Sequence, residues 1–65
     1  MVLADRKLDG YDYEITLQRD EHGNLRVVVE HAEIHSVEWV RAADNGKEAL
    51  DIYYHPFTYG LQIGT

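Results

Sequence analysis

Two histidines and a glutamate alternate in the segment His31-Ala32-Glu33-Ile34-His35. In an extended strand, residues two apart point to the same side, so these three side chains would share one face. Imidazole and carboxylate groups in this combination are zinc ligands, and His55 could supply a fourth. The spacing therefore predicts a divalent-metal site at His31, Glu33 and His35. The alternative is a bend here, with the histidines hydrogen-bonded to carboxylates and tyrosines.

Acidic residues and tyrosines form a second group with possible chemistry. If residues 11–18 and 25–30 pair as a hairpin, Glu14 lies opposite Glu30, with Asp12 next on the same face. A basic partner would relieve this repulsion, and salt would also screen it. Tyrosine is enriched at protein interfaces because it joins a large apolar body to a polar group. We therefore expect a protein partner to contact an acidic, tyrosine-rich surface formed by Asp12, Glu14, Glu30, Tyr11, Tyr53 and Tyr59.

Signals for catalysis are weak. Ser36 is the only serine, and it adjoins His35, whose side chain would point to the opposite face of a strand. The sequence also lacks the glycine-rich phosphate-binding motifs. A non-catalytic protein-binding or assembly module of the regulator or inhibitor type is therefore favoured. The alternatives are the metal-binding domain and a small enzyme with its site at a subunit interface, where the same histidines would act as acid–base groups.

Composition limits the class of protein. The chain has 65 residues, no cysteine, 12 acidic and 6 basic side chains, and a net charge of −6. So short a chain buries little surface, so we expect it to form a homo-oligomer or bind a protein partner. The acidic charge disfavours direct nucleic-acid binding. No apolar run is long enough to span a membrane, and no segment resembles a signal peptide. We expect a cytoplasmic protein with no cofactor except the possible metal.

The alternation of apolar and polar residues predicts two hairpins. Residues 11–18 and 25–30 flank a turn in which Gly23 is expected to have a positive φ. The predicted register places Leu17 opposite Val27, Ile15 opposite Val29, and Tyr13 opposite His31. The second hairpin turns at Asn45-Gly46, a strong type I′ signal. Its predicted pairs are Arg41 with Leu50, Trp39 with Ile52, and Val37 with Tyr54.

Residues 25–42 contain no glycine or proline, so we expect one long strand that bends near residues 31–35. Residues 57–63 fit a fifth strand, and residues 1–8 fit a flexible arm or a short strand. The sequence thus predicts one domain over residues 1–65, all-β and mostly antiparallel. It would be a bent small sheet or barrel of four or five strands, built from two hairpins sharing the long central strand. Self-association is expected through a second apolar surface formed by Val28, Ile34, Val40 and residues 57–63.

Overall fold

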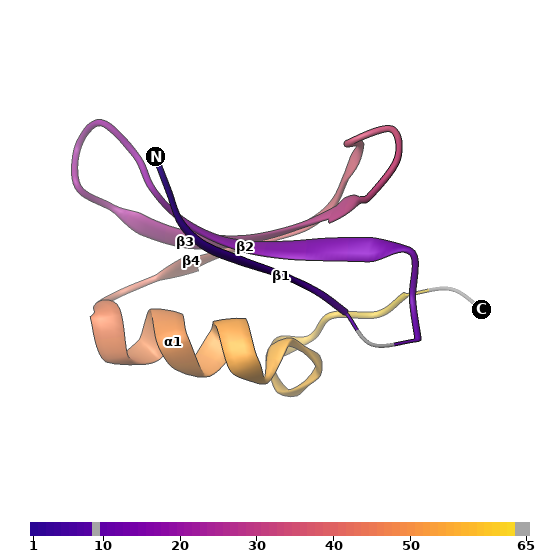
Figure 1. Cartoon of the computed structure of the whole chain (residues 1–65). Helices are drawn as coiled ribbons and strands as arrows, with labels where there is room; N and C mark the ends of the chain where they lie inside the picture. The colour runs from indigo at the N-terminus through magenta and orange to yellow at the C-terminus, as the bar shows by residue number, and fades with distance from the viewer. Residues whose placement is uncertain (9, 64–65) are drawn as a thin grey trace.

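Four antiparallel strands form an open sheet whose order follows the chain. The computed structural model describes residues 1–8 and 10–63. The strands are β1 (Val2–Lys7), β2 (Tyr13–Arg19), β3 (Leu25–His31) and β4 (Val37–Ala43). The helix α1 (Gly46–Tyr54) and the 3-10 helix η1 (Pro56–Tyr59) follow them. The helix lies against one face of the sheet, and the ends of the β2–β3 and β3–β4 hairpins curl away from it (Figure 1).

The first hairpin has the predicted register. Ile15 pairs with Val29, Leu17 with Val27, and Tyr13 with His31. The turn between the strands is closed by Asp20, whose Oδ1 accepts the backbone N–H groups of His22 and Asn24 at 2.8 and 2.9 Å. Gly23 has the expected positive φ, 83°. The alternating pattern and the turn residues agree here, and together they determine the pairing.

The long central strand was a wrong prediction, because the chain reverses fully between β3 and β4. The two strands pair with each other, so that Val28 lies opposite Val40 and Val29 opposite Trp39. The connecting turn contains His35 with a φ of 57°, a left-handed conformation that is uncommon outside glycine. Backbone hydrogen bonds from His31 N–H to Ser36 O and from His35 N–H to His31 O, 2.9 and 2.8 Å long, close it.

The second hairpin was also a wrong prediction, since residues 46–54 form a helix instead of a strand. Asn45 caps this helix, because its side chain accepts the backbone N–H of Glu48 at 2.8 Å. The Glu48 carboxylate in turn accepts the backbone N–H of Asp44 at 3.0 Å. Such a reciprocal arrangement satisfies amides that a helix start leaves unpaired, and it opposes a tight hairpin turn.

Of the predicted alternatives, the structure has the open four-stranded sheet, whereas the barrel and the fifth strand were wrong. Pro56 begins the 3-10 helix η1, where its fixed φ is compatible with the first turn. Gly60 ends η1 with a φ of 103°. Residues 1–8, by contrast, contain the short strand that was one of the two expectations, and β1 pairs with β2. The fold is therefore mostly β, but it contains a helix and the sheet stays open.

The core lies between the sheet and α1. Every second residue of β2 and β3 points to it, and α1 contributes residues three and four apart on its inner face. The fully or nearly fully buried members are Leu8, Ile15, Leu17, Val27, Val29, Ala49, Ile52, Tyr53 and Leu61. Trp39, predicted to face the core, is half-buried and packs against this cluster.

Both outer strands contain one extra residue relative to their neighbours. In β1, Val2 lies opposite Gln18 but Ala4 lies opposite Leu17, so Leu3 is inserted. In β4, Glu38 is inserted between the residues that face Glu30 and Val29. The central pair β2–β3 has no such shift. The second insertion moves Val37 to the face away from the helix, although its parity predicted the core face.

Candidate binding surfaces

The predicted metal ligands lie around the β3–β4 turn. His31 Nε2 is 3.4 Å from the Asp12 carboxylate, and His35 Nδ1 is 3.4 Å from the Glu30 carboxylate. The backbone N–H of Glu33 donates to His31 Nδ1 at 3.3 Å. His31 Nδ1 thus accepts a hydrogen bond from the backbone, and Nε2 is the ring nitrogen that faces the Asp12 carboxylate. Each histidine therefore has its own carboxylate partner.

The structure does not bring the proposed ligands together as a set. In residues 1–8 and 10–63, no three histidine, cysteine, aspartate or glutamate side chains are close enough to hold one metal ion. Glu33 points to solvent from the turn. His55 lies at the far end of α1, where its backbone N–H donates to Asp51 O at 2.8 Å. The arrangement matches the alternative in which the chain bends and carboxylates accept from the histidines.

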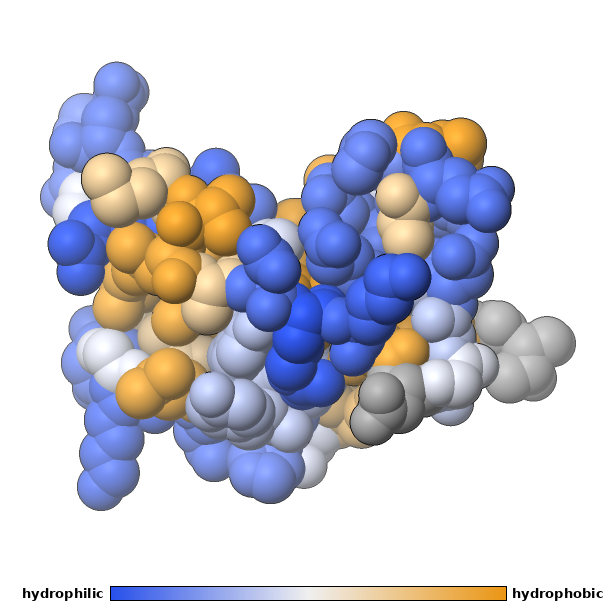
Figure 2. Space-filling model, viewed as in Figure 1, coloured by the Kyte–Doolittle hydropathy of each residue, from blue (hydrophilic) through white to orange (hydrophobic). Residues whose placement is uncertain are grey.

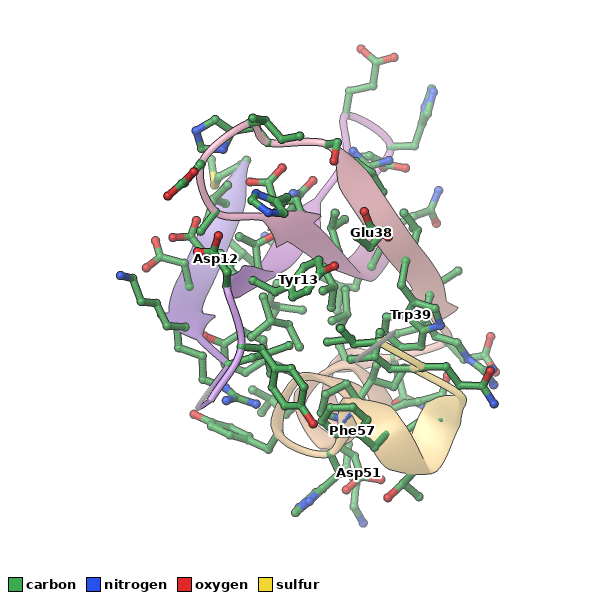
Figure 3. All side chains as sticks on the ribbon, turned by 90° about the vertical axis from the view of Figure 1, so that its right-hand side faces the viewer. Asp12, Tyr13, Glu38, Trp39, Asp51 and Phe57 are labelled. Carbon is green, nitrogen blue, oxygen red and sulfur yellow. The ribbon has the colours of Figure 1, made fainter. Side chains whose placement is uncertain are left out.

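The three acidic residues expected at a partner surface lie at one end of the sheet. Glu14 is directly opposite Glu30, as predicted, and Lys7 is opposite Glu14 on its other side. Figure 3 shows Asp12 in the upper part of this end view, and Glu38 farther across the sheet on the outer strand β4. Lys7 offsets part of the negative charge of this acidic end, formed by Asp12, Glu14 and Glu30.

The structure divides the tyrosines between the core and the surface. Tyr53 is only 3% exposed and packs in the core, and burial raises the pKa of its hydroxyl above the ordinary value. Its neighbour Tyr54 is 59% exposed. The strand interpretation had assigned these two residues the other way round, because a helix and a strand present consecutive side chains differently. Tyr11 is exposed and Tyr59 is half-buried.

Tyr59 links three elements. Its hydroxyl donates to the Asp51 carboxylate, and this hydrogen bond raises the pKa of the tyrosine. The guanidinium of Arg41 donates to the Tyr59 carbonyl oxygen at 3.3 Å and lies 5.5 Å from the ring centre. Tyr59 thus connects β4 to α1 through η1. A partner could contact only part of a ring held in this way.

A continuous group of exposed apolar side chains lies on the helix side of the molecule. Its members are Leu50 and Tyr54 on α1, Phe57 on η1, and Tyr11 before β2, all at least 40% exposed. The Tyr11 and Phe57 rings are in contact, with centres 6.0 Å apart. In Figure 3, Phe57 lies with the helical segment in the lower part of the view, below Asp12 and Tyr13. We call Tyr11, Leu50, Tyr54 and Phe57 the aromatic surface.

Two shallow hollows indent this surface. One, of about 600 Å³, is lined by Leu50 and Tyr54 together with polar residues including Lys47, Asp51 and His55. The other, of about 300 Å³, lies between Tyr11, Tyr54 and Phe57. Tyr54 and His55 line both hollows, so they adjoin around the end of α1. Hollows lined by aromatic rings can take the anchoring side chains of a binding partner.

The second apolar surface expected for self-association is split by the fold. Val28 is buried and Val40 exposed on the face of the sheet away from the helix, while Ile34 is exposed in the β3–β4 turn. Residues 57–63 lie on the other side of the sheet, with the helix. Figure 2 shows that the uncovered side is hollowed between the two projecting hairpin ends. Its apolar residues also gather near the start of β1, where Met1, Val2 and Leu3 are exposed.

Among the residues of these hollows that sequence reasoning missed are Leu50, Tyr54 and Arg6. A spacing of four between Leu50 and Tyr54, followed by Phe57 three residues later, is the signal of an apolar stripe on a helix. This helical spacing was obscured because residues 50, 52 and 54 are apolar at every second position, which is also the pattern of a strand. The position of Arg6 had no signal, because its contacts are with residues 47 and 48 places later in the chain.

In the part of the chain that the structure describes, no helix is long and apolar enough to cross a membrane. Comparisons with models of known families, with curated proteins and with solved structures found no match to this chain.

Proposed function

We propose that this protein is a non-catalytic protein-binding module that contacts its partner through the aromatic surface. The observation that carries this proposal is the exposure of Leu50 and Tyr54, at 49% and 59%, on the outer side of the only α-helix in the described residues. The inner side of that helix already covers the core, and neither of these two side chains belongs to the core cluster. Large apolar and aromatic side chains exposed side by side mark interaction sites.

The side chains of the aromatic surface are of the types that bind other proteins. Tyr11, Tyr54 and Phe57 supply broad, rigid contact area, and rings of this kind account for much of the binding energy at interfaces. Charged groups lie around them, including Lys47, Asp51 and Arg6, and could fix the orientation of the partner. The acidic end of the sheet, with Asp12 next to Tyr11 in the chain, would extend the contact toward a basic region of the partner.

The test compares matched variants in a cross-linking and affinity-capture experiment from the source cell. The double variant Leu50→Ala/Tyr54→Ala removes the centre of the aromatic surface. Val40→Ala is the control, because it removes an exposed apolar side chain from the opposite face of the sheet. We expect the first variant to lose its partner and the second to retain it. Retention of the same partner by the double variant would overturn the proposal.

Self-association is measured in the same series by sedimentation of the purified protein. A dimer that becomes monomeric in Leu50→Ala/Tyr54→Ala, and not in Val40→Ala, would identify the partner as a second copy of this chain. A dimer lost only in Val40→Ala would move the interface to the uncovered face of the sheet. Charge reversal of Asp12 and Glu14 tests the contribution of the acidic end, and we expect weakened capture that high salt also weakens. The proposal keeps the expectation, based on composition, that the protein is cytoplasmic.

A further inference from the structure

Arg6 lies at the edge of the aromatic surface, where β1 meets the end of α1. Its side chain is on the helix side of the sheet, since Arg6 lies opposite the buried Ile15. One NH2 donates to the carbonyl oxygen of Tyr53 at 2.6 Å. The guanidinium carbon is 5.2 Å from the Tyr53 ring centre and 5.8 Å from that of Tyr54. These contacts hold the guanidinium in one place.

The guanidinium retains much of its donor capacity. An arginine side chain has five N–H donors, and the structure gives that of Arg6 one protein acceptor, the Tyr53 carbonyl. Its Nε is buried without a hydrogen-bond partner. The ion pairs among the described residues all involve histidines, so no carboxylate there lies within pairing distance of Arg6. A partly buried arginine with no carboxylate partner is unusual, because its charge is costly to desolvate alone.

Arg6 also lines the smaller hollow of the aromatic surface. The hollow has a volume of about 300 Å³. Its walls are largely aromatic, with Tyr11, Tyr54 and Phe57, and its other polar side chains are those of His55 and Thr58. None of the described residues that line it is acidic, in a chain with twice as many acids as bases. The hollow therefore combines aromatic rings and polar groups with one fixed positive charge.

We propose that this hollow binds a carboxylate carried on a ring-sized apolar group. The guanidinium of Arg6 pairs with the carboxylate, for which its planar donor fork is suited. The rings of Tyr11, Tyr54 and Phe57 contact the apolar part. Pockets that bind small groups are typically apolar with one or two fixed polar groups, and about 300 Å³ is at the lower end of their usual size. The inference deepens the proposed function and rests on it only for the source of the carboxylate, which would be the partner's chain end or acidic side chain.

Two effects oppose an anion at this place, and both are smaller than the attraction of Arg6. The last carbonyl groups of α1 carry a partial negative charge, equivalent to about half an elementary charge at a helix end. Arg6 carries a full positive charge and already pairs with one of those carbonyls. The net charge of −6 acts over longer distances, where physiological salt screens it.

The test is a titration of the ¹⁵N-labelled protein followed by NMR, with phenylacetate and its neutral analogue phenylacetamide. The two ligands have nearly the same shape, so a difference between them reports the charge of the carboxylate. We expect saturable shifts of residues lining the hollow with phenylacetate and at least about tenfold weaker binding of phenylacetamide, the scale of one charge-assisted hydrogen bond. Absence of saturable binding, or equal binding of the two ligands, would overturn the inference.

Three variants locate the binding. Phe57→Ala removes an exposed wall of the hollow, and we expect weaker binding of phenylacetate without loss of fold. Arg6→Lys keeps the charge but loses the planar fork, and we expect weaker binding with a smaller preference over phenylacetamide. Val40→Ala, on the opposite face, is the control and should leave both affinities unchanged. Unchanged affinity in both Phe57→Ala and Arg6→Lys would place the binding elsewhere and contradict the inference.

A second pair of ligands distinguishes the source of the carboxylate. A short peptide that ends in phenylalanine is compared as the free acid and as the C-terminal amide. Tighter binding of the acid peptide than of phenylacetate would identify the chain end of a partner protein. If the acid peptide binds no more tightly than phenylacetate, the ligand is a small free carboxylate. If no carboxylate binds but Leu50→Ala/Tyr54→Ala still loses its partner, this inference fails while the proposed function stands. If phenylacetate binds but Leu50→Ala/Tyr54→Ala retains its partner, the proposed function fails while this inference stands.

Discussion

Asn45 accepts a hydrogen bond from the backbone N–H of Glu48, with 2.8 Å between the two heavy atoms. This contact stabilises the start of the helix after β4, because it satisfies an amide that the first helical turn leaves unpaired. We expect Asn45→Ala to lower the free energy of unfolding by about 1 kcal/mol, as measured by urea denaturation. Asn45→Ser and Asn45→Asp retain an acceptor and should stay close to the parent. Equal stability of Asn45→Ala and Asn45→Ser would contradict this role.

Leu50 and Ile52 distinguish the helix from the strand that the alternating sequence suggested. In a strand the two side chains would share a face, whereas in α1 Ile52 is fully buried and Leu50 is 49% exposed. We expect Ile52→Val to cost about 1 kcal/mol of unfolding free energy and Ile52→Ala about 2–5 kcal/mol. Leu50→Ala should change it by no more than about 0.5 kcal/mol. Similar losses at the two positions, measured by thermal or urea denaturation, would argue against the helix.

Acid should weaken the β2–β3 turn through Asp20. Backbone hydrogen bonds, first from Asn24 and also from His22, hold the pKa of this carboxyl below its ordinary value of 3.8. Because the folded-state pKa is below the unfolded one, the carboxylate stabilises the fold above about pH 4. That contribution is lost as the pH falls through the lowered pKa. We expect Asp20→Asn to lose less stability between neutral pH and about pH 2 than the parent. Glu21→Gln, which changes an exposed acid in the same turn, is the control.

Raising the pH should weaken a stabilising contact of Tyr59, whereas lowering it weakens that of Asp20. The hydrogen bond to the Asp51 carboxylate raises the pKa of Tyr59 above its ordinary value of 10.0. A raised folded-state pKa means that the contact stabilises the fold below about pH 10, and that this contribution is lost as the pH rises through the folded pKa. We expect Asp51→Asn to lower the pKa of Tyr59, as followed by NMR of its ring. Asp44→Asn should not, and an unchanged Tyr59 pKa in Asp51→Asn would contradict the contact.

Zinc should not stabilise the protein, because each of His31 and His35 has a separate carboxylate partner, Asp12 and Glu30. We expect neither added Zn²⁺ nor EDTA to shift the melting temperature or the mass measured by native mass spectrometry. The double variant His31→Gln/His35→Gln should respond to both in the same way as the parent. A zinc-dependent rise in melting temperature that this variant abolishes would restore the metal hypothesis.

The sequence was sufficient for the parts of the fold in which local signals agree. Residues 13–19 and 25–31 alternate on both sides of a turn containing Gly23, so the register of β2 and β3 follows from the pattern. Around Asn45-Gly46 the signals conflict. The dipeptide favours a hairpin, while Asn45 and Glu48 favour a helix start, and residues 49, 52, 53 and 56 have helical spacing. Burial of the helical face against β2 and β3 decides between them.

The turn between β3 and β4 could not be predicted, because it uses neither glycine nor proline. It depends on His35 in a left-handed conformation and on side-chain contacts to Glu30 and Asp12. The contact between His31 and Asp12 exists only once β2 and β3 are paired. The sequence indicated that tyrosines would form part of a binding surface, but it did not indicate where in the fold that surface lies. Tyr11 was identified, whereas Arg6 reaches Tyr53 only in the folded protein.

The inserted residues Leu3 and Glu38 have a consequence for the behaviour of the protein at high concentration. An open sheet exposes unpaired backbone groups along its first and last strands, and another chain can add to such a strand and continue the sheet. A bulge locally breaks the regular spacing of those groups and increases the twist. Here each outer strand contains one, and the inner pair contains none. Fibre growth by strand addition is thereby hindered at both ends of the sheet, while the pairing that specifies the fold is left regular.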